Sequence, residues 1–581
     1  MTMVTALRDS LARQNLDGLI IWRGDIYSGE EVRACDERLA FISGFTGSAG
    51  FALILPDKAV VFSDGRYHLQ MAQELAKDIW QWRDSGPNAL ADYLADYIAE
   101  TGLGELRLGF DEMTTTLSQR DNLPDKAEDC AITWHPLASH PIDALWHDRP
   151  EFIRQSAFFL DDWQTGCMAD IKIANAQSAL QKAGHDGLFI SAVDCANWLC
   201  NIRGSDLANT PFHLCFAYLP KQGDLVLIGA DLPADHSTSF SSLSFSECDD
   251  FLASLTGKVI SVDPASLPSG MARLMTKHQL QMVKESCPLL AIKAQKNETE
   301  LSGFRKAHLI DAAAFCRFWF WLERQNAAQF HETDLVEILQ KQRQSHADYL
   351  MDSFDAIMGS GANGAIIHYR AQAGSDSLIQ PDNLLLIDSG AHYRFGTTDI
   401  TRTLIIGQAD SDMKAAYTAV LASHIALGRA VFPHGTRGDN LDAICRAPLW
   451  ETGRDYAHGT GHGVGHMLSV HEGPVHISKR ASLPLEKGMV LSNEPGFYEA
   501  GQWGIRLENL VAVCEAEISG FYAFENLTMV PFETKLIVPE YLDDSARQWL
   551  NDYHQAVHQA LLPYCDDEAM RQWLCDKCAA I

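Results

Sequence analysis

The sequence has no apolar run of 18 or more residues, so no segment is expected to span a membrane. Its first residues, MTMVTALRDSLARQ, lack the apolar core of a secretory signal peptide. Basic residues are also scarce, because 46 Lys and Arg stand against 76 Asp and Glu, for a formal net charge of −30. That charge repels nucleic-acid phosphates and acidic membranes. We therefore expect a cytoplasmic protein that binds neither nucleic acid nor membrane.

The 14 cysteines are unremarkable for 581 residues, and most lie in apolar surroundings. Free, buried thiols are the expected state. Cys575 and Cys578 form a C-x-x-C pair with no second pair, so a metal knuckle there is a weak prediction.

The length predicts several domains. A faint duplication relates residues 11–21 to 180–190, since each stretch reads as a helix end, an Asp-Gly turn and an apolar strand. It predicts two similar α/β domains, at 1–150 and 151–290. Long amphipathic helices follow, and we expect a third domain over 291–581.

The end of this third domain is expected to be a helical extension. Ser545 and Gln548 predict a capping box at its start. A buried stripe is predicted on the same helix, formed by Trp549, Tyr553, Ala556, Val557 and Ala560.

Residues 457–474, AHGTGHGVGHMLSVHEGP, concentrate histidines among glycines. His458 and His462 have the spacing of a helical zinc motif, but no Glu follows His458. Each intervening glycine would cost a helix about 1 kcal/mol. The stretch therefore predicts loop and extended chain with inward-facing histidines. His462 is the best ligand candidate, because its flanking glycines would let a metal approach.

Four acids follow or lie within apolar strands of this domain. Asp388 ends a buried strand, and Asp399 lies on the alternating strand TTDITRT with Thr401 and Thr403 on the same face. Glu494 follows VLSN, and Glu508 shares a strand face with Arg506, opposite Ile505 and Leu507. Four converging carboxylates without a matching lysine repel one another at low dielectric. Two divalent cations would compensate them.

The order Asp388, Asp399, His462, Glu494, Glu508 resembles the dinuclear site of the creatinase and methionine-aminopeptidase superfamily, the pita-bread metallopeptidases. The motifs HGTGHGVG, VHEGP, SNEPGFY, GIRLEN and IIHYR resemble those of the three-domain cytosolic Xaa-Pro aminopeptidases. The resemblance covers essentially the whole chain. It implies an α/β (α+β) protein in which two creatinase-like domains precede a pita-bread catalytic domain.

The resemblance also implies a role for each residue. Asp388 would bind one metal ion, Asp399 and Glu508 would bridge both ions, and His462 and Glu494 would bind the other. Three further histidines would orient substrate and steady the tetrahedral intermediate: His368, His458 and His471. Of these, His458 would form the wall of a proline pocket. Arg506 and Thr401 would lie beside the ligands, and His466 matches no role and is expected to pack.

These residues predict removal of the N-terminal residue from peptides with proline second. A water bridging two ions has a pKa lowered toward about 7, which would supply a bridging hydroxide, and Glu494 would relay the proton. Four carboxylates and one imidazole favour Mn²⁺, with Zn²⁺ or Co²⁺ as alternatives. The resemblance further implies a homodimer.

Two alternatives stay open. A prolidase would cut only Xaa-Pro dipeptides, and an inactive pita-bread relative would bind proteins without hydrolysis. The three-domain length argues against the first, and the complete set of five ligand residues argues against the second.

Overall fold

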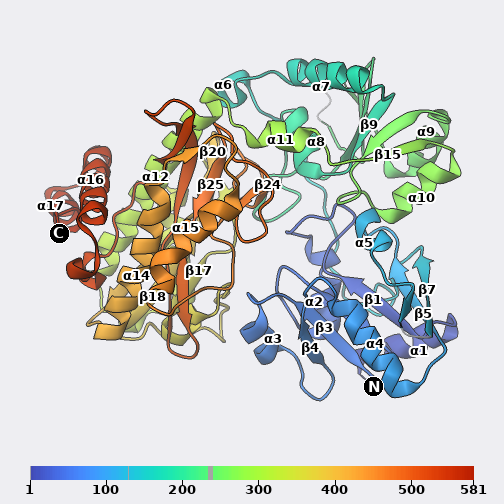
Figure 1. Ribbon diagram of the computed structural model, residues 1–581, viewed down its shortest axis with the longest axis horizontal. Helices are drawn as coiled ribbons and strands as arrows, with labels where there is room; N and C mark the ends of the chain where they lie inside the picture. Colours follow the sequence, from blue (N-terminus) through green and yellow to red (C-terminus); the bar gives the residue numbers. More distant parts are fainter. Residues whose placement is uncertain (1, 128–129, 233–239) are drawn as a thin grey trace. The chain divides into compact units, whose positions relative to one another are not determined.

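The computed structural model describes residues 2–127, 130–232 and 240–581. The chain forms two compact units, which are described separately (Figure 1). The first comprises Met1–Leu160, Cys167–Ala208 and Phe212–Leu289, and the second comprises Asp161–Gly166, Asn209–Pro211 and Leu290–Ile581. Among the described helices, none is both long and apolar enough to cross a membrane.

The first unit contains two sheets that have the same topology apart from the additional edge strand β6, in agreement with the duplication. Their strand orders are β4-β3-β2-β1-β5-β7-β6 and β13-β12-β11-β9-β14-β15. In both, the strand after the first helix pairs antiparallel on one side and parallel on the other. The first sheet comprises β1 (Gly18–Trp22), β2 (Phe51–Ile54), β3 (Ala59–Ser63), β4 (Gln81–Asp84), β5 (Glu105–Asp111), β6 (Lys126–Ala127) and β7 (Cys130–Leu137).

The second sheet comprises β9 (Gly187–Ile190), β11 (Phe216–Pro220), β12 (Leu225–Ile228), β13 (Phe240–Leu243), β14 (Val259–Val262) and β15 (Gln281–Lys284). The helix and turn expected before each central strand are present, as α1 (Met3–Arg13) before β1 and α7 (Ala169–Ala183) before β9. Both sheets belong to one compact unit. The proposed boundary at residue 150 stays a prediction.

Two sheets of the second unit carry or flank the predicted acids and His462. The smaller sheet has the antiparallel order β17-β18-β21, and the larger has the order β22-β29-β28-β25-β23-β24. The first three strands are β17 (Ile357–Ser360), β18 (Asn383–Ser389) and β21 (Ile400–Ile406). The larger sheet comprises β22 (Phe432–Pro433), β23 (Gly461–Gly463), β24 (Glu472–Ile477), β25 (Val490–Asn493), β28 (Asn509–Glu515) and β29 (Phe521–Asn526).

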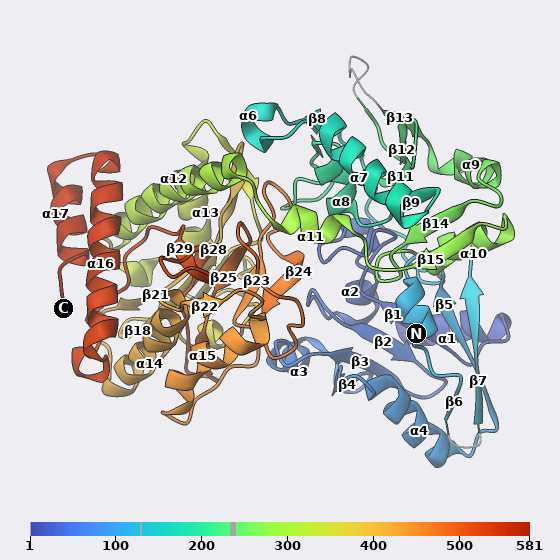
Figure 2. The same cartoon turned by 45° about the horizontal axis from the view of Figure 1, so that its top comes forward.

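Long helices lie outside these strands (Figure 2): α12 (Glu298–Leu322), α13 (Glu332–Gln344), α14 (Ser411–Gly428) and α15 (Gly438–Trp450). Asn297 begins α12 with a capping box to Glu300. The Trp-rich part of α12 is core, because Phe315, Phe318 and Trp319 are buried in the largest apolar cluster of the described residues.

The helical extension consists of α16 (Asp544–Leu561) and α17 (Glu568–Lys577), which pack against α12. The predicted capping box is wrong: Asp543 is the N-cap, because its carboxylate accepts from the backbone N–H of Ala546. The buried stripe is also shifted, since Ala556 is exposed. It is formed by Leu550, Tyr553, His554, Val557 and Leu561.

All 14 cysteines are free thiols. Among the described residues, only Cys575 is exposed, and ten are buried. No cysteine belongs to a candidate metal-binding group within the described part of the chain, so the weak prediction for Cys575 and Cys578 gains no support.

Candidate metal centre

Asp388 and Asp399 come together because β18 and β21 are paired. Asp388 lies opposite Thr401 in that pairing, and Asp399 directly precedes β21. Both side chains are buried, and within the described structure the Oδ1 atom of each has no hydrogen-bond partner. Burial raises the pKa of Asp388 to about 6. A buried carboxylate oxygen without a donor is costly unless a cation occupies the position it faces.

Glu508 reaches the same place between β27 (Trp503–Arg506) and β28. Its backbone N–H donates to the Thr401 carbonyl at 3.0 Å, and the Thr401 hydroxyl donates to its Oε2 at 2.8 Å. Burial, followed by the charge of Asp399, raises the pKa of Glu508 well above its usual value. The expected continuous strand is interrupted, since β27 ends at Arg506 and β28 begins at Asn509.

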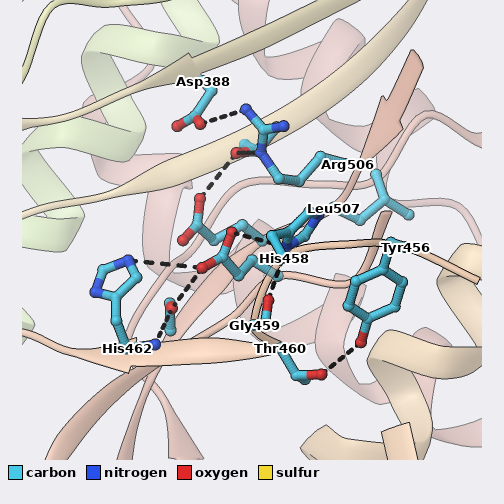
Figure 3. Close-up of polar contacts among 12 residues, drawn as sticks. Asp388, Tyr456, His458, Gly459, Thr460, His462, Arg506 and Leu507 are labelled. Carbon is cyan, nitrogen blue, oxygen red and sulfur yellow. Dashed lines mark hydrogen bonds and ion pairs between the residues drawn. The ribbon is translucent and has the colours of Figure 1, made fainter. Parts of the chain in front are cut away.

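His462 lies on β23 with one ring nitrogen directed at the acids (Figure 3). Its Nδ1 is 3.0 Å from the Gly463 carbonyl oxygen and donates to it. The lone pair of Nε2 is therefore available, 3.5 Å from Oδ2 of Asp399 and 3.8 Å from Oε1 of Glu494. Ligand atoms of Asp399, His462 and Glu508 all lie within 4.8 Å of one another.

The glycines beside His462 have a different role from the one expected. A Cβ at Gly461 would lie 2.0 Å from the Ser492 carbonyl oxygen, and one at Gly463 would lie 2.3 Å from that of Glu472. The missing side chains thus let β25 and β24 approach β23, rather than leaving space for a metal.

Glu494 follows β25 and completes the set of four acids. Its backbone N–H donates to the Thr460 carbonyl at 2.9 Å, and the Ser492 hydroxyl donates to Oε1 at 3.3 Å. Burial raises the pKa of Glu494. Four mutually repelling carboxylates and an imidazole with a free lone pair fit a pair of divalent cations.

An arginine, Arg506, forms hydrogen bonds within this acidic group. Arg506 donates through Nη2 to Oδ2 of Asp388 at 2.6 Å (Figure 3). It also donates through Nη1 to the Tyr498 hydroxyl at 2.7 Å. The Tyr498 hydroxyl is then free to donate to Nε2 of His458 at 2.8 Å. Tyr498 was not predicted individually, and its only signal was its place in the SNEPGFY motif.

His458 is a neutral histidine in this arrangement. Its Nδ1 lies 2.7 Å from the Gly459 carbonyl oxygen and donates to it, while Nε2 accepts from Tyr498. Burial, and then the charge of Arg506, holds the pKa of His458 well below its usual value. Because both ring nitrogens form hydrogen bonds, the ring contacts its other neighbours through carbon atoms.

The loop that carries His458 is anchored by α15. Arg446 donates to the His458 carbonyl at 2.7 Å, and its guanidinium lies 3.8 Å from the Tyr456 ring centroid. The Thr460 hydroxyl donates to Oδ1 of Asp442 at 2.6 Å. The helix therefore holds a glycine-rich segment that has little rigidity of its own.

Two further predicted histidines lie near this group. The His471 ring packs edge-on against His462, with centroids 4.3 Å apart. His368 is among the groups whose charge lowers the pKa of His458. His466 is buried, and its Nε2 bonds the Phe395 carbonyl at 2.9 Å, in agreement with the expected packing role.

The segment that carries His368 is held by hydrogen bonds to the carboxylate of Glu332. Glu332 is fully buried and accepts from four groups of residues 360–377: the backbone N–H of Ser360, the amide of Asn363, the hydroxyl of Tyr369 and the backbone N–H of Ser377. Tyr369 is the neighbour of His368, so this carboxylate fixes the chain beside the histidine.

Comparison with known proteins identifies the family. Residues 302–515 match Metallopeptidase family M24, and residues 520–581 match the C-terminal region of that peptidase family. Residues 3–143 and 148–300 each match a Creatinase/Prolidase N-terminal domain. A probable Xaa-Pro aminopeptidase P from Laccaria bicolor is 34% identical over 99% of this chain and 92% of its own length. The chain belongs to the aminopeptidase P family of M24 metallopeptidases.

Other relatives agree with this assignment. Aminopeptidase P2 from Arabidopsis thaliana is 35% identical over 96% of the chain and 85% of its own length. The X-prolyl aminopeptidase of Caenorhabditis elegans, described as a cytosolic enzyme with a di-nuclear active site, is 27% identical. It covers 100% of this chain and 99% of its own, with a TM-score of 0.93. The expected pita-bread fold with two creatinase-like domains is thus confirmed.

Proposed function

We propose that the chain removes the N-terminal residue from peptides with proline in second position. The observation that carries this proposal is a group of three buried acids, Asp388, Asp399 and Glu508, with the partly exposed Glu494 and His462. Paired strands place this group in a chain that resembles X-prolyl aminopeptidases along its full length. As an M24 metallopeptidase the chain is a hydrolase.

We assign the metal ligands as in the sequence-based prediction. Asp388 would hold one ion, Asp399 and Glu508 would bridge the pair, and His462 and Glu494 would hold the other. Mn²⁺ suits four carboxylates and one imidazole, with Zn²⁺ or Co²⁺ as alternatives. When bound, such a pair supplies an activated water as nucleophile and a Lewis acid for the scissile carbonyl.

The protein side chains would transfer the proton and bind the substrate. Glu494 takes a proton on its carboxylate and returns it to the leaving nitrogen of proline. His368 and His471 bind and orient the substrate through their ring nitrogens. Because both nitrogens of His458 are engaged, its ring supplies an apolar wall for the rigid proline ring.

A comparison of peptide substrates tests this function. Metal-stripped enzyme, reloaded with Mn²⁺, Zn²⁺ or Co²⁺, is incubated with Arg-Pro-Pro and with the dipeptide Arg-Pro. We expect release of Arg from the tripeptide, with Mn²⁺ most effective. Cleavage of the dipeptide alone would establish the prolidase alternative, and cleavage of neither, in a protein that binds metal, would establish the binding module.

Cytoplasmic location and a homodimer complete the proposal. The C. elegans relative is described as cytosolic, and 14 free thiols suit a reducing compartment. Light scattering on the purified protein would give twice the chain mass of 64.3 kDa for a homodimer.

A further inference from the structure

Arg402 is a buried cation directly behind the acidic group. It lies on β21, three residues after Asp399, and its side chain is fully buried. Its Nη1 donates to the Glu508 carbonyl at 2.6 Å and to the Thr401 carbonyl at 3.0 Å. In the described part of the chain, no carboxylate accepts from this guanidinium. Its hydrogen bonds thus hold main chain rather than a counter-ion.

The other side of the same guanidinium faces the C-terminal part of the chain. The two N–H groups of Nη2 are shared among three acceptors: the Val530 carbonyl at 2.7 Å, Oδ1 of Asn509 at 2.8 Å and the Tyr553 hydroxyl at 3.1 Å. Nε donates to the Pro531 carbonyl at 3.1 Å. The planar fork of arginine can satisfy acceptors in several directions at once, whereas a lysine ammonium cannot span them.

Tyr553 links helix α16 to the Arg402 guanidinium. Its hydroxyl oxygen lies 2.8 Å from the Val530 carbonyl and donates to it, while accepting from Arg402. Its ring stacks on Trp549 of the same helix, with an interplanar angle of 2°. The hydroxyl therefore has little freedom, and α16 fixes one side of the Arg402 fork.

We infer that α16 helps to position Glu508 for metal binding, with Tyr553 and Arg402 as the positioning residues. Arg402 holds the carbonyl of Glu508, while Thr401 holds its carboxylate at 2.8 Å. A shift of the fork would move the main chain of Glu508 and hence its side chain. This inference rests on the proposed function only in taking Glu508 as a bridging ligand. It assigns the C-terminal extension a part in the metal site.

Metal titration of the full-length protein tests the inference. Metal-stripped wild type, Tyr553→Phe and Arg402→Lys are titrated with Mn²⁺ by calorimetry. Tyr417→Phe is the matched control, because its hydroxyl is equally buried but accepts from the backbone N–H of Glu533 instead of from Arg402. We expect about 10-fold weaker Mn²⁺ binding in the first two variants and none of this loss in the control.

A second readout separates positioning from general stability. The rise of Tm on adding saturating Mn²⁺ should shrink in Tyr553→Phe, even if the metal-free Tm falls no further than in Tyr417→Phe. Unchanged Mn²⁺ affinity in Tyr553→Phe, or an equal loss in Tyr417→Phe, would overturn the inference. If Arg402→Lys does not fold, Tyr553→Phe decides alone.

The titration contains no peptide, so it is independent of the activity. Wild type that binds two Mn²⁺ ions but cleaves no Xaa-Pro peptide would remove the proposed function and leave the inference to be judged on the variants. Wild type that binds none of Mn²⁺, Zn²⁺ and Co²⁺ would overturn both.

Discussion

Arg506 and Asp388 form a buried ion pair, with Nη2 of the arginine 2.6 Å from Oδ2 of the aspartate. The same guanidinium holds the Tyr498 hydroxyl. Breaking a buried pair leaves one charge without compensation, which costs about 3–5 kcal/mol. The pair is thus a sensitive point at which to perturb the site.

The first prediction concerns Arg506. Arg506→Lys keeps the charge but cannot bond Asp388 and Tyr498 together, so we expect kcat/KM and Mn²⁺ affinity to fall about 10- to 100-fold. Steady-state kinetics and calorimetry measure the two effects. Arg305→Lys is the control. Arg305 also forms two hydrogen bonds to a carboxylate, that of Glu525, but both of these side chains are partly exposed. Equal losses in both variants would contradict a special role for Arg506.

The second prediction concerns Tyr369. Loss of its hydroxyl leaves Glu332 with one donor fewer and frees the chain next to His368. We expect kcat/KM for Arg-Pro-Pro to fall about tenfold in Tyr369→Phe, since losing one buried hydrogen bond costs about 1.4 kcal/mol.

A double-mutant cycle checks that Tyr369 acts through His368. In a His368→Ala background, Tyr369→Phe should cause no further loss. Tyr349→Phe, which removes a tyrosine bond to Asp352, serves as the control. Additive losses would show that the hydroxyl acts in another way.

The parts of the site that could be predicted were those marked by local patterns in the sequence. Asp388 could be placed because it lies near the end of a buried strand. Asp399 was expected on the alternating strand but directly precedes it, while Thr401 and Thr403 lie on the expected face. The convergence of these acids with Glu494 and Glu508 was inferred from electrostatics and from motif resemblance.

The partners that hold the acids could not be predicted in the same way. Glu332 is 37 residues from Tyr369 in sequence, and Arg402 is 151 residues from Tyr553. Neither separation corresponds to a helix or strand periodicity, so no sequence pattern indicates the contact. The roles of Gly461 and Gly463 were misjudged for a related reason, because the backbone atoms that crowd them belong to strands paired through tertiary structure.

The third prediction is that metal removal lowers stability. Without cations, the repulsion among the four carboxylates of the site, three of them buried, is offset by few positive groups. Mn²⁺ at about 1,000 times its Kd should stabilise the fold by about 4 kcal/mol for each ion. Calorimetric unfolding of metal-free and loaded protein measures the difference. Glu508→Gln should reduce the gain, whereas the surface variant Glu517→Gln should not, and equal Tm values for free and loaded wild type would contradict the metal site.

The fourth prediction concerns acid stability and His554. Burial lowers the pKa of His554 from its ordinary 6.5 to about 4, and its Nε2 accepts the backbone N–H of Phe532 at 3.2 Å. The unfolded chain therefore binds the proton more readily. This contribution is fully present above pH 6.5 and is lost toward pH 4, by about 1.4 kcal/mol per pH unit.

Denaturant unfolding at pH 7 and pH 5 tests this expectation. His554→Gln keeps an acceptor but cannot take up the proton, so its free energy of unfolding should fall less between the two pH values than that of wild type. His558→Gln, at a partly exposed position of the same helix, should behave like wild type. An unaltered pH response in His554→Gln would refute the assignment.

The distribution of thiols makes selective chemical labelling practical. A maleimide dye reacts with thiolates that solvent can reach, and Cys575 is the one exposed cysteine of the described residues. Burial raises the pKa of the Cys445 thiol to about 12 and holds that of the Cys316 thiol well above its usual value, so these sulfurs stay unreactive. Cys575 lies two residues from Trp573, which packs edge-on against Trp319 of α12. A fluorophore there would report detachment of the last helix in real time.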